Sequence, residues 1–292
     1  MGDVKTKDIT GFGTVANAVA SVTNNVINKI SHAVGVIYND STHKIKKESL
    51  RKVYEEIANN ENIDPFSKMA IISNLKQDLK YYKNQRNIIL QAINNISDDA
   101  NVDLVDDDWL NFFFDKARII SSEEMQNIWG KILSEEFNKP RSIPKSLLHT
   151  ISCIDLELAN IFNKLCCFTV KYEESGENHI FLDYNNFTDQ LNAIGITFNA
   201  LLALERFGLI SFNSTIGYCV IIDSRNCTFL SQKNKFILKP DKKGQIPIGS
   251  VLLTDDGNVL CDCIQKEYNP LIFEMIKSIC KDNIEEIIEI GT

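Results

Sequence analysis

Apolar residues recur at intervals of three or four along residues 10–38, and the residues between them are polar but almost uncharged. This spacing predicts one amphipathic helix, because residues three and four apart lie on the same helix face. The stretch is too interrupted to span a bilayer by itself. We therefore expect its apolar face to lie on a membrane or to pack on the body of the protein or on another copy of the chain, with a mobile tail as the remaining alternative. That face consists of Phe12, Val15, Val19, Val22, Val26, Ile30 and Ile37.

Two further helices are predicted at about 44–60 and 66–96, because Asp64 followed by Pro65 is a typical helix start. The second helix is long and carries a periodic apolar stripe, which predicts a buried face. The stripe consists of Met69, Ile72, Leu75, Leu79, Tyr82, Ile89 and Ile93.

Cations outnumber anions by ten to six between residues 44 and 86. If the first helix lies on a membrane, the cations that directly follow it would meet anionic lipid, and each would contribute about 1 kcal/mol. These lipid-facing residues are Lys44, Lys46, Lys47, Arg51 and Lys52.

The middle of the chain is predicted to be entirely helical. An aspartate-rich turn precedes a helix that Asp107 or Asp108 is expected to cap. Ser121 and Glu124 stand at capping-box spacing and predict the start of the next helix. Helices near 145–150 and 155–167 complete this region. The helix after Ser121 has a core-facing stripe of Met125, Ile128, Trp129, Ile132 and Leu133.

The pattern changes at about residue 180. A helix, a turn at Gly195, a helix capped by Thr197 and a glycine stop at Gly208 precede the apolar, β-branched segments GYCVII, CTFL and KFIL, which predict strands. Another helix starts at Thr254, and the amphipathic segment 270–290 is expected to form a terminal helix. This order is typical of a winged helix-turn-helix domain.

The predicted fold class is therefore mainly α with a C-terminal α+β part. We expect an amphipathic N-terminal segment at 1–43, a helical domain at 44–170, and a winged-helix-like domain with a terminal helix at 171–292. A chain of 292 residues is long enough for more than one core.

Composition and charge narrow the function classes. The net charge of −8 argues against nucleic acid as the default partner, because phosphate binding needs clustered cations. The eight cysteines lie mostly in apolar runs, which indicates reduced core cysteines in a cytoplasmic protein. Aspartates, cysteines and histidines lack metal-site spacing, and no phosphate-binding glycine loop is present. We expect no metal, no cofactor and no enzymatic activity.

A winged helix raises DNA binding as an alternative. The expected recognition helix, TFNALLALERF, has one cation beside one anion, whereas base readout needs Arg, Lys, Asn or Gln side chains. The lysines of the hairpin region suit phosphate contacts or a solvated loop. Candidate nucleic-acid or partner contacts are Arg206, Lys233, Lys235 and Lys239.

The segments SSEEMQNIWGKILSEEFNKP and LLHTISCIDLELANIF resemble an uncharacterised bacterial family of unknown-function domains and, more distantly, the Abi-alpha abortive-infection family. The shared helix has Glu123, Gln126, Trp129, Ile132 and Leu133 at the matching places, and LERFGLI and LLTDDGNVL occupy the winged-helix end. The likeness covers roughly residues 105–265. The first helix lies outside it.

The resemblance implies a role in bacterial defence against phage. The function that we expect is a non-enzymatic, self-assembling effector or scaffold of the abortive-infection type, which acts on the membrane through residues 10–38. Its expected partners are further copies of the chain, anionic lipid, and an operon partner protein or a phage trigger. The expected location is the cytoplasm, with peripheral association at the inner membrane. The alternative is a DNA- or protein-binding regulator that uses the winged helix and oligomerises through the N-terminal helix.

Overall fold

The computed structural model describes residues 17–35, 47–222, 227–231, 234–240, 244–264, 266–281 and 284–291. The chain divides into two compact units, Met1–Leu148 and His149–Thr292. The first is helical in its described residues, and the second combines helices with antiparallel strands. The predicted class, mainly α with a C-terminal α+β part, is confirmed.

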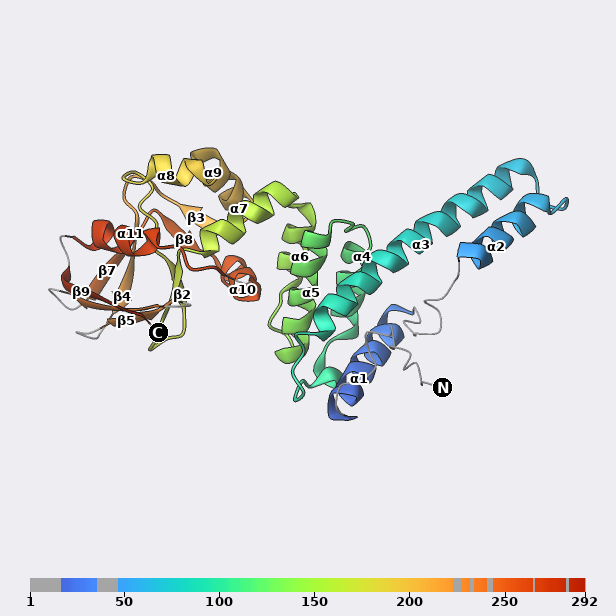
Figure 1. Ribbon diagram of the computed structural model, residues 1–292, viewed down its shortest axis with the longest axis horizontal. Coiled ribbons are helices and arrows are strands. Elements are labelled where there is room, and N and C mark those ends of the chain that lie inside the picture. Colours follow the sequence, from blue (N-terminus) through green and yellow to red (C-terminus); the bar gives the residue numbers. More distant parts are fainter. Residues whose placement is uncertain are drawn as a thin grey trace, which may run out of the picture. The chain divides into compact units, whose positions relative to one another are not determined.

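The described part of the first unit is built from helices (Figure 1). A short 3-10 helix, η2, lies between the third and fourth α-helices, and α6 continues across the division between the units. The elements are α1 (Asn17–Val34), α2 (Lys47–Asn59), α3 (Pro65–Ile93), η2 (Val102–Leu104), α4 (Asp107–Ala117), α5 (Glu123–Asn138) and α6 (Lys145–Cys153).

Side-chain caps fix where these helices begin. The Asp64 carboxylate accepts hydrogen bonds from the Phe66 and Ser67 amides, both at 3.0 Å, as the predicted start requires. Two other caps differ from the prediction by one or two positions. Asp106, not Asp107 or Asp108, accepts from the Trp109 amide at 2.8 Å. Ser122, not Ser121, caps α5; the Ser121 hydroxyl lies 3.2 Å from the Asn84 amide nitrogen instead.

Aromatic side chains fill the core of the first unit. Phe113 and Trp129 are fully buried with ring centroids 5.1 Å apart, and Trp109 stacks on Phe113 at 5.2 Å. The Trp109 indole N–H donates to the Ile143 carbonyl at 2.8 Å, which satisfies the polar atom of a buried ring. The predicted stripe of α5 is confirmed for its buried members Met125, Trp129, Ile132 and Leu133.

The long helix α3 has two different halves. Its C-terminal half packs on α5 and buries Asn84, Gln85, Ile88, Ile89 and Ala92. Its N-terminal half runs beside α2 beyond the rest of this unit (Figure 1). The predicted buried stripe is therefore wrong at Met69, whose side chain is 73% exposed, because α2 is the one described element that packs along this half.

In its described residues, the second unit contains five more α-helices and the strands. The elements are α7 (Leu156–Cys166), β1 (Thr169–Tyr172), β2 (Asn178–Ile180), α8 (Thr188–Ala193), α9 (Phe198–Arg206), β3 (Ile210–Phe212), β4 (Tyr218–Ile222), β5 (Cys227–Leu230), β6 (Asn234–Pro240), β7 (Gly244–Gly249), β8 (Val251–Leu253), α10 (Asp255–Cys263), α11 (Leu271–Cys280) and β9 (Ile284–Gly291).

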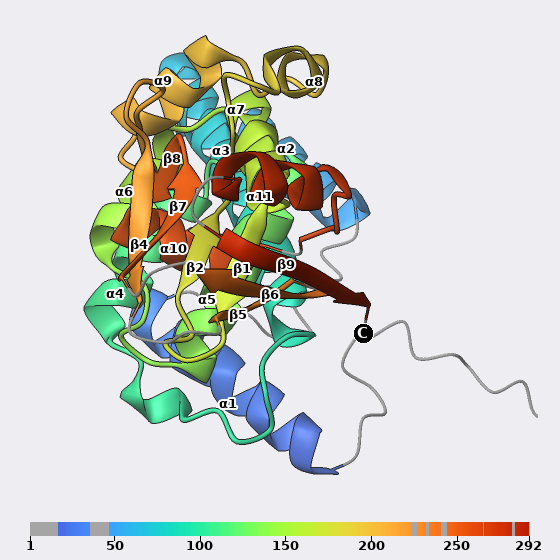
Figure 2. The same cartoon turned by 90° about the vertical axis from the view of Figure 1, so that its left-hand side faces the viewer.

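The strands form three antiparallel groups. One sheet has the order β2-β1-β5-β6-β9, while β3 pairs with β8 and β4 pairs with β7. Helix α11 lies across strands of this unit and contacts β7 and β9 (Figure 2). The predicted strands GYCVII, CTFL and KFIL are confirmed as β4, β5 and β6, and Thr197 and Thr254 cap α9 and α10 as predicted.

The predicted terminal helix is wrong beyond Cys280. Residues Ile284–Gly291 form β9, which pairs along its length with β6. The isoleucines of this segment favour a strand, and two of its glutamates have side-chain partners. The Glu289 carboxylate accepts from the Tyr268 hydroxyl at 2.7 Å, and Glu286 contacts Lys239.

Candidate functional site

The apolar face of α1 lies against the first unit. Val26 and Ile30 are 1% and 0% exposed, and α1 packs on α4 and η2. The Lys29 ammonium lies 2.7 Å from the Asp107 carboxylate and holds the pKa of Asp107 below its usual value. Val22 is half-buried, and only the backbone of Val19 is described. Among the other predicted members of this face, Phe12, Val15 and Ile37 lie outside the described residues.

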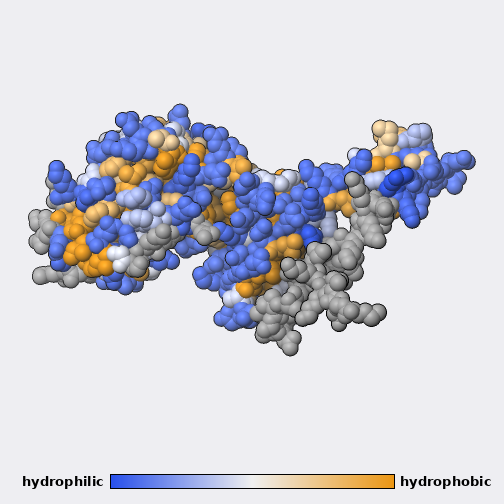
Figure 3. All heavy atoms as spheres, viewed as in Figure 1, coloured by the Kyte–Doolittle hydropathy of each residue, from blue (hydrophilic) through white to orange (hydrophobic). Residues whose placement is uncertain are grey.

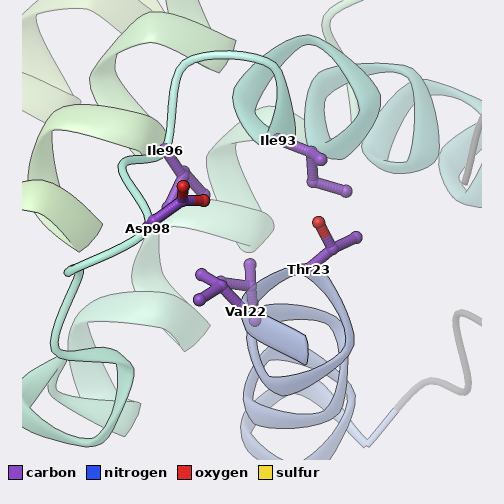
Figure 4. Close-up of a pocket in the computed structure, with 6 residues that line it drawn as sticks. Val22, Thr23, Ile93, Ile96 and Asp98 are labelled. Atoms are coloured by element: carbon purple, nitrogen blue, oxygen red, sulfur yellow. The ribbon is translucent and has the colours of Figure 1, made fainter. Parts of the chain in front are cut away.

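A small depression marks the seam between α1 and the end of α3. Figure 4 shows Val22 and Thr23 on one side of it, with Ile93, Ile96 and Asp98 on the other. The lining is mainly apolar, with one carboxylate. The depression is therefore part of the docking of α1. No helix in the described part of the chain combines the length and apolarity needed to cross a membrane.

The predicted lipid-facing cations are only partly described. Arg51 and Lys52 are exposed on α2, and the Arg51 guanidinium lies 2.7 Å from the Glu55 carboxylate. Lys47 begins α2, and its side chain is not among those described, whereas Lys44 and Lys46 lie outside the described residues altogether. The two described cations therefore lie on the helix that runs beside α3.

An apolar surface stripe runs along α9. Phe198, Leu202 and Arg206 are four residues apart and thus lie on one helix face. Phe198 is 44% exposed and Leu202 is 37% exposed, although both are large apolar residues. On the opposite face Ala200, Leu201 and Leu204 are buried. We call Phe198, Leu202 and Arg206 the α9 stripe.

Neighbouring aromatic rings hold the Phe198 ring in place. Its centroid lies 5.2 Å from that of Phe212 and 6.0 Å from that of Tyr184, and the latter two lie 5.6 Å apart. The Glu205 carboxylate accepts a hydrogen bond from the Phe212 amide at 2.9 Å and so ties α9 to β3. Phe198 is therefore an exposed but pre-ordered aromatic side chain, and aromatic residues are enriched in the cores of protein interfaces.

The cations proposed for nucleic-acid contact are distributed differently. Arg206 is exposed at the end of α9. The Lys235 ammonium lies 3.4 Å from the Glu173 carboxylate, and Lys239 pairs with Glu286 across β6 and β9. Lys233 lies outside the described residues. Of the predicted cations that the structure describes, the two on β6 thus have acidic partners.

Residue-type reasoning did not single out Phe198 and Leu202. The spacing of four between Phe198, Leu202 and Arg206 was visible in the sequence, but the buried face of α9 contains similar residues. Only the packing of Leu201 and Leu204 into the core shows which apolar residues remain at the surface.

Two buried thiols approach each other between α7 and α10. The Cys261 sulfur lies 3.5 Å from the Thr169 hydroxyl, and a hydrogen bond with Cys166 is the main cause that lowers the pKa of Cys261 to about 7. Burial raises the pKa of Cys166. Both side chains are 0% exposed, so they serve core packing. In the part of the chain that the structure describes, no three His, Cys, Asp or Glu residues are placed to hold a metal ion.

Comparison with known proteins gives one match. The model of a family described as "Protein of unknown function (DUF2806)" matches residues 48–277, which is most of the chain. Comparisons with curated proteins and with solved structures find no match. The matched range contains the segments that carry the resemblance to an uncharacterised family, and it starts after α1.

Proposed function

The chain belongs to the DUF2806 family of proteins of unknown function, and from that premise we propose that it is a non-enzymatic protein-binding scaffold of bacterial anti-phage defence. In this proposal the second unit contacts a protein partner through the α9 stripe. The observation that carries the proposal is the exposure of Phe198 and Leu202 on a helix whose other face is buried.

The order of elements in the second unit supports a winged-helix assignment. A first helix, α7, packs on α9, and α8 and α9 follow each other through a turn at Gly195. Strand β3 directly follows α9 in the chain, and β8 directly precedes α10. These two strands pair with each other, and β2 lies beside β8. Apart from the additional strand β1, this is the succession of helix, strand, helix, helix and strand pair that winged helices use. Strands β4 to β7 are then an insertion between the two wing strands.

The chemistry of the α9 stripe supports a protein partner over DNA. In a winged helix this helix corresponds to the one that reads base edges with polar side chains, whereas the α9 stripe begins with Phe198 and Leu202 and has one cation. Asp189 is exposed on the preceding helix α8, where a carboxylate would repel phosphate. A pre-ordered, exposed phenylalanine instead resembles the aromatic residues that are enriched in the cores of protein interfaces.

The position of α1 supports a scaffold over a membrane effector. Insertion of its apolar face into lipid would first require Val26 and Ile30 to leave the core of the first unit and Lys29 to leave Asp107. Both steps cost free energy before any lipid is contacted. The defence role itself rests on the likeness of residues 105–265 to the Abi-alpha family.

The test of partner contact is site-specific photo-crosslinking in living cells. Benzoylphenylalanine replaces Leu202 in the full chain, and the matched control has the same group at Asn192, which is exposed on α8. We expect a discrete adduct with another protein from position 202 only, because a short-range crosslinker reacts where a partner covers the helix. Phe198→Ala in the same chain should abolish the adduct.

A parallel titration of labelled duplex DNA tests the DNA alternative. We expect no salt-dependent binding by the full chain. Binding that weakens with salt and is lost in Arg206→Glu, together with no protein adduct from position 202, would refute the proposal and favour a DNA-binding regulator. An adduct that contains only the chain itself would assign the α9 stripe to self-association.

A further inference from the structure

The projecting hairpin of the first unit has no buried side chain. Within residues 51–83, all of which the structure describes, every side chain is half-buried or exposed. We call these residues the α2–α3 hairpin. Phe66 is 82% exposed and Met69 is 73% exposed, and Val53 and Ile71 are at least 40% exposed. Figure 3 shows apolar atoms at the surface among hydrophilic ones on this projection.

Two helices packed only on each other bury too little to be stable. The α2–α3 hairpin is held by a half-buried apolar seam and by isolated polar contacts, such as the Lys68 ammonium 2.8 Å from the Ala58 carbonyl. Helices of this length need tertiary packing of an apolar face, and exposed apolar clusters mark interaction surfaces. The seam consists of Tyr54, Ile57, Ile63, Ile72, Leu75, Leu79 and Tyr82.

Charge is unevenly distributed along the α2–α3 hairpin. Near the tip, where α2 ends and α3 begins, anions prevail, and further from the tip cations prevail. Six cations and five anions make the segment nearly neutral in a chain whose net charge is −8. The acidic end contains Glu55, Glu56, Glu61 and Asp64 with Lys68, and the basic end contains Arg51, Lys52, Lys76, Lys80 and Lys83 with Asp78.

We propose that two copies of the chain pair through their α2–α3 hairpins in antiparallel orientation and form an intermolecular four-helix bundle. The acidic tip of each hairpin then lies beside the basic end of the other, and Phe66 and Met69 of each copy are covered by the hairpin of its partner. Such an arrangement is two-fold symmetric and self-complementary. Antiparallel helix pairs packed on each other are the usual form of four-helix bundles.

The size of the surface fits a stable dimer. At about 1.5 Å per residue, α3 from Pro65 to Lys83 is about 28 Å long, and two adjacent helices are about 20 Å wide. The flat projection of this face is therefore about 560 Å². The relief of the side chains increases the accessible area toward the roughly 800 Å² per partner of standard interfaces.

The charge pattern of the α2–α3 hairpin also favours a second copy of the chain over a membrane as the partner of this surface. The most exposed apolar residues of the α2–α3 hairpin, Phe66 and Met69, lie in the first turns of α3, close to Glu61 and Asp64. Anionic lipid would repel these carboxylates, whereas the basic end of a second hairpin attracts them. The proposed dimer goes beyond the α9 stripe and lies in the other unit, so either proposal can fail without the other.

Charge reversal in the full chain tests the antiparallel arrangement. Glu56→Lys with Glu61→Lys reverses the tip, and Lys80→Glu with Lys83→Glu reverses the basic end; all four side chains are exposed. Each pair of substitutions should weaken dimerisation about tenfold or more, because like charges then face each other. Combining all four in one chain, or mixing the two variants, should restore the dimer. Sedimentation velocity measures the shift between the 33.1 kDa monomer and the dimer.

Apolar substitutions test the contact itself. Phe66→Ser and Met69→Ser should each weaken dimerisation about tenfold or more, whereas Ile119→Ser, at an apolar residue that is 55% exposed elsewhere in this unit, should not. Circular dichroism of each variant checks that the helices remain. A wild-type chain that stays monomeric at micromolar concentrations would overturn the proposal. A dimer that these substitutions leave unchanged, or that the combined charge reversal fails to restore, would do the same.

Discussion

Replacing Gly130 by alanine tests the contact that anchors α3. Gly130 lies in α5 where this helix meets α3, and a Cβ atom placed there would lie 2.5 Å from the Gln91 Cβ and 3.2 Å from the Ala92 backbone nitrogen. Non-bonded carbons prefer about 3.5–4.0 Å, so the helices would have to separate by about 1 Å. Neither neighbouring atom can move aside by changing a rotamer, because both positions are fixed by the backbone.

Two opposing effects determine the size of the change. Overpacking a core costs about 1–3 kcal/mol, and the rigidity of the Gln91 contact places this site in the upper half of that range. Alanine in a helix interior is about 1 kcal/mol more favourable than glycine. We therefore expect Gly130→Ala to lower the free energy of unfolding by about 1–2 kcal/mol. For a unit of this size the melting temperature should fall by about 3–8 °C.

Tryptophan fluorescence measures this change in the first unit alone, because both tryptophans of the chain, Trp109 and Trp129, lie there. The matched control is Asn127→Ala, at an exposed position of the same helix, which should raise the free energy of unfolding by a few tenths of a kcal/mol through helix propensity. A Gly130→Ala protein that is stabilised as much as Asn127→Ala would refute the close packing of α3 on α5.

Two further predictions concern buried titratable groups. The Glu136 carboxylate accepts hydrogen bonds from the Arg141 amide at 2.6 Å and the Ile143 amide at 3.0 Å. Glu136→Gln leaves one of these N–H groups without an acceptor. It should lower the free energy of unfolding of the first unit by about 1–3 kcal/mol, measured by a fluorescence-detected melt. Burial lowers the pKa of His179 from 6.5, so the unfolded chain binds more protons and the second unit should lose stability as the pH falls below about 6.5. His179→Phe should make the stability of the second unit less dependent on pH, as measured by amide exchange of β1 and β2. An unchanged slope of stability against pH would contradict this role of His179.

Local patterns in the sequence predicted the helical core well. The stripe of α5 and the start of α3 depend on spacing and caps within one element, and Trp129 and Asp64 take the expected places. The prediction missed the caps at Asp106 and Ser122 because neighbouring residues have the same capping chemistry. Only the path of the preceding chain selects between these residues.

The remaining differences depend on contacts between distant residues. The segment IEEIIEI suits a helix or a strand, and pairing with β6 decides for the strand. The periodicity of α3 predicts an apolar face but does not show that Met69 lies beyond the reach of α5. The same limit applies to the surface, because the spacing of Phe198 and Leu202 identifies the α9 stripe only after Leu201 and Leu204 are seen to fill the core.

Phage challenge of bacteria that produce the full chain tests whether the α9 stripe serves defence. We predict that the wild-type chain reduces plaque formation. Leu202→Glu and Phe198→Glu should each abolish this protection at equal protein levels and with an unchanged melting temperature. Arg206→Glu should retain the protection. Protection that survives both apolar substitutions, or a wild-type chain that protects against no phage of a broad panel, would contradict a defence scaffold that acts through the α9 stripe.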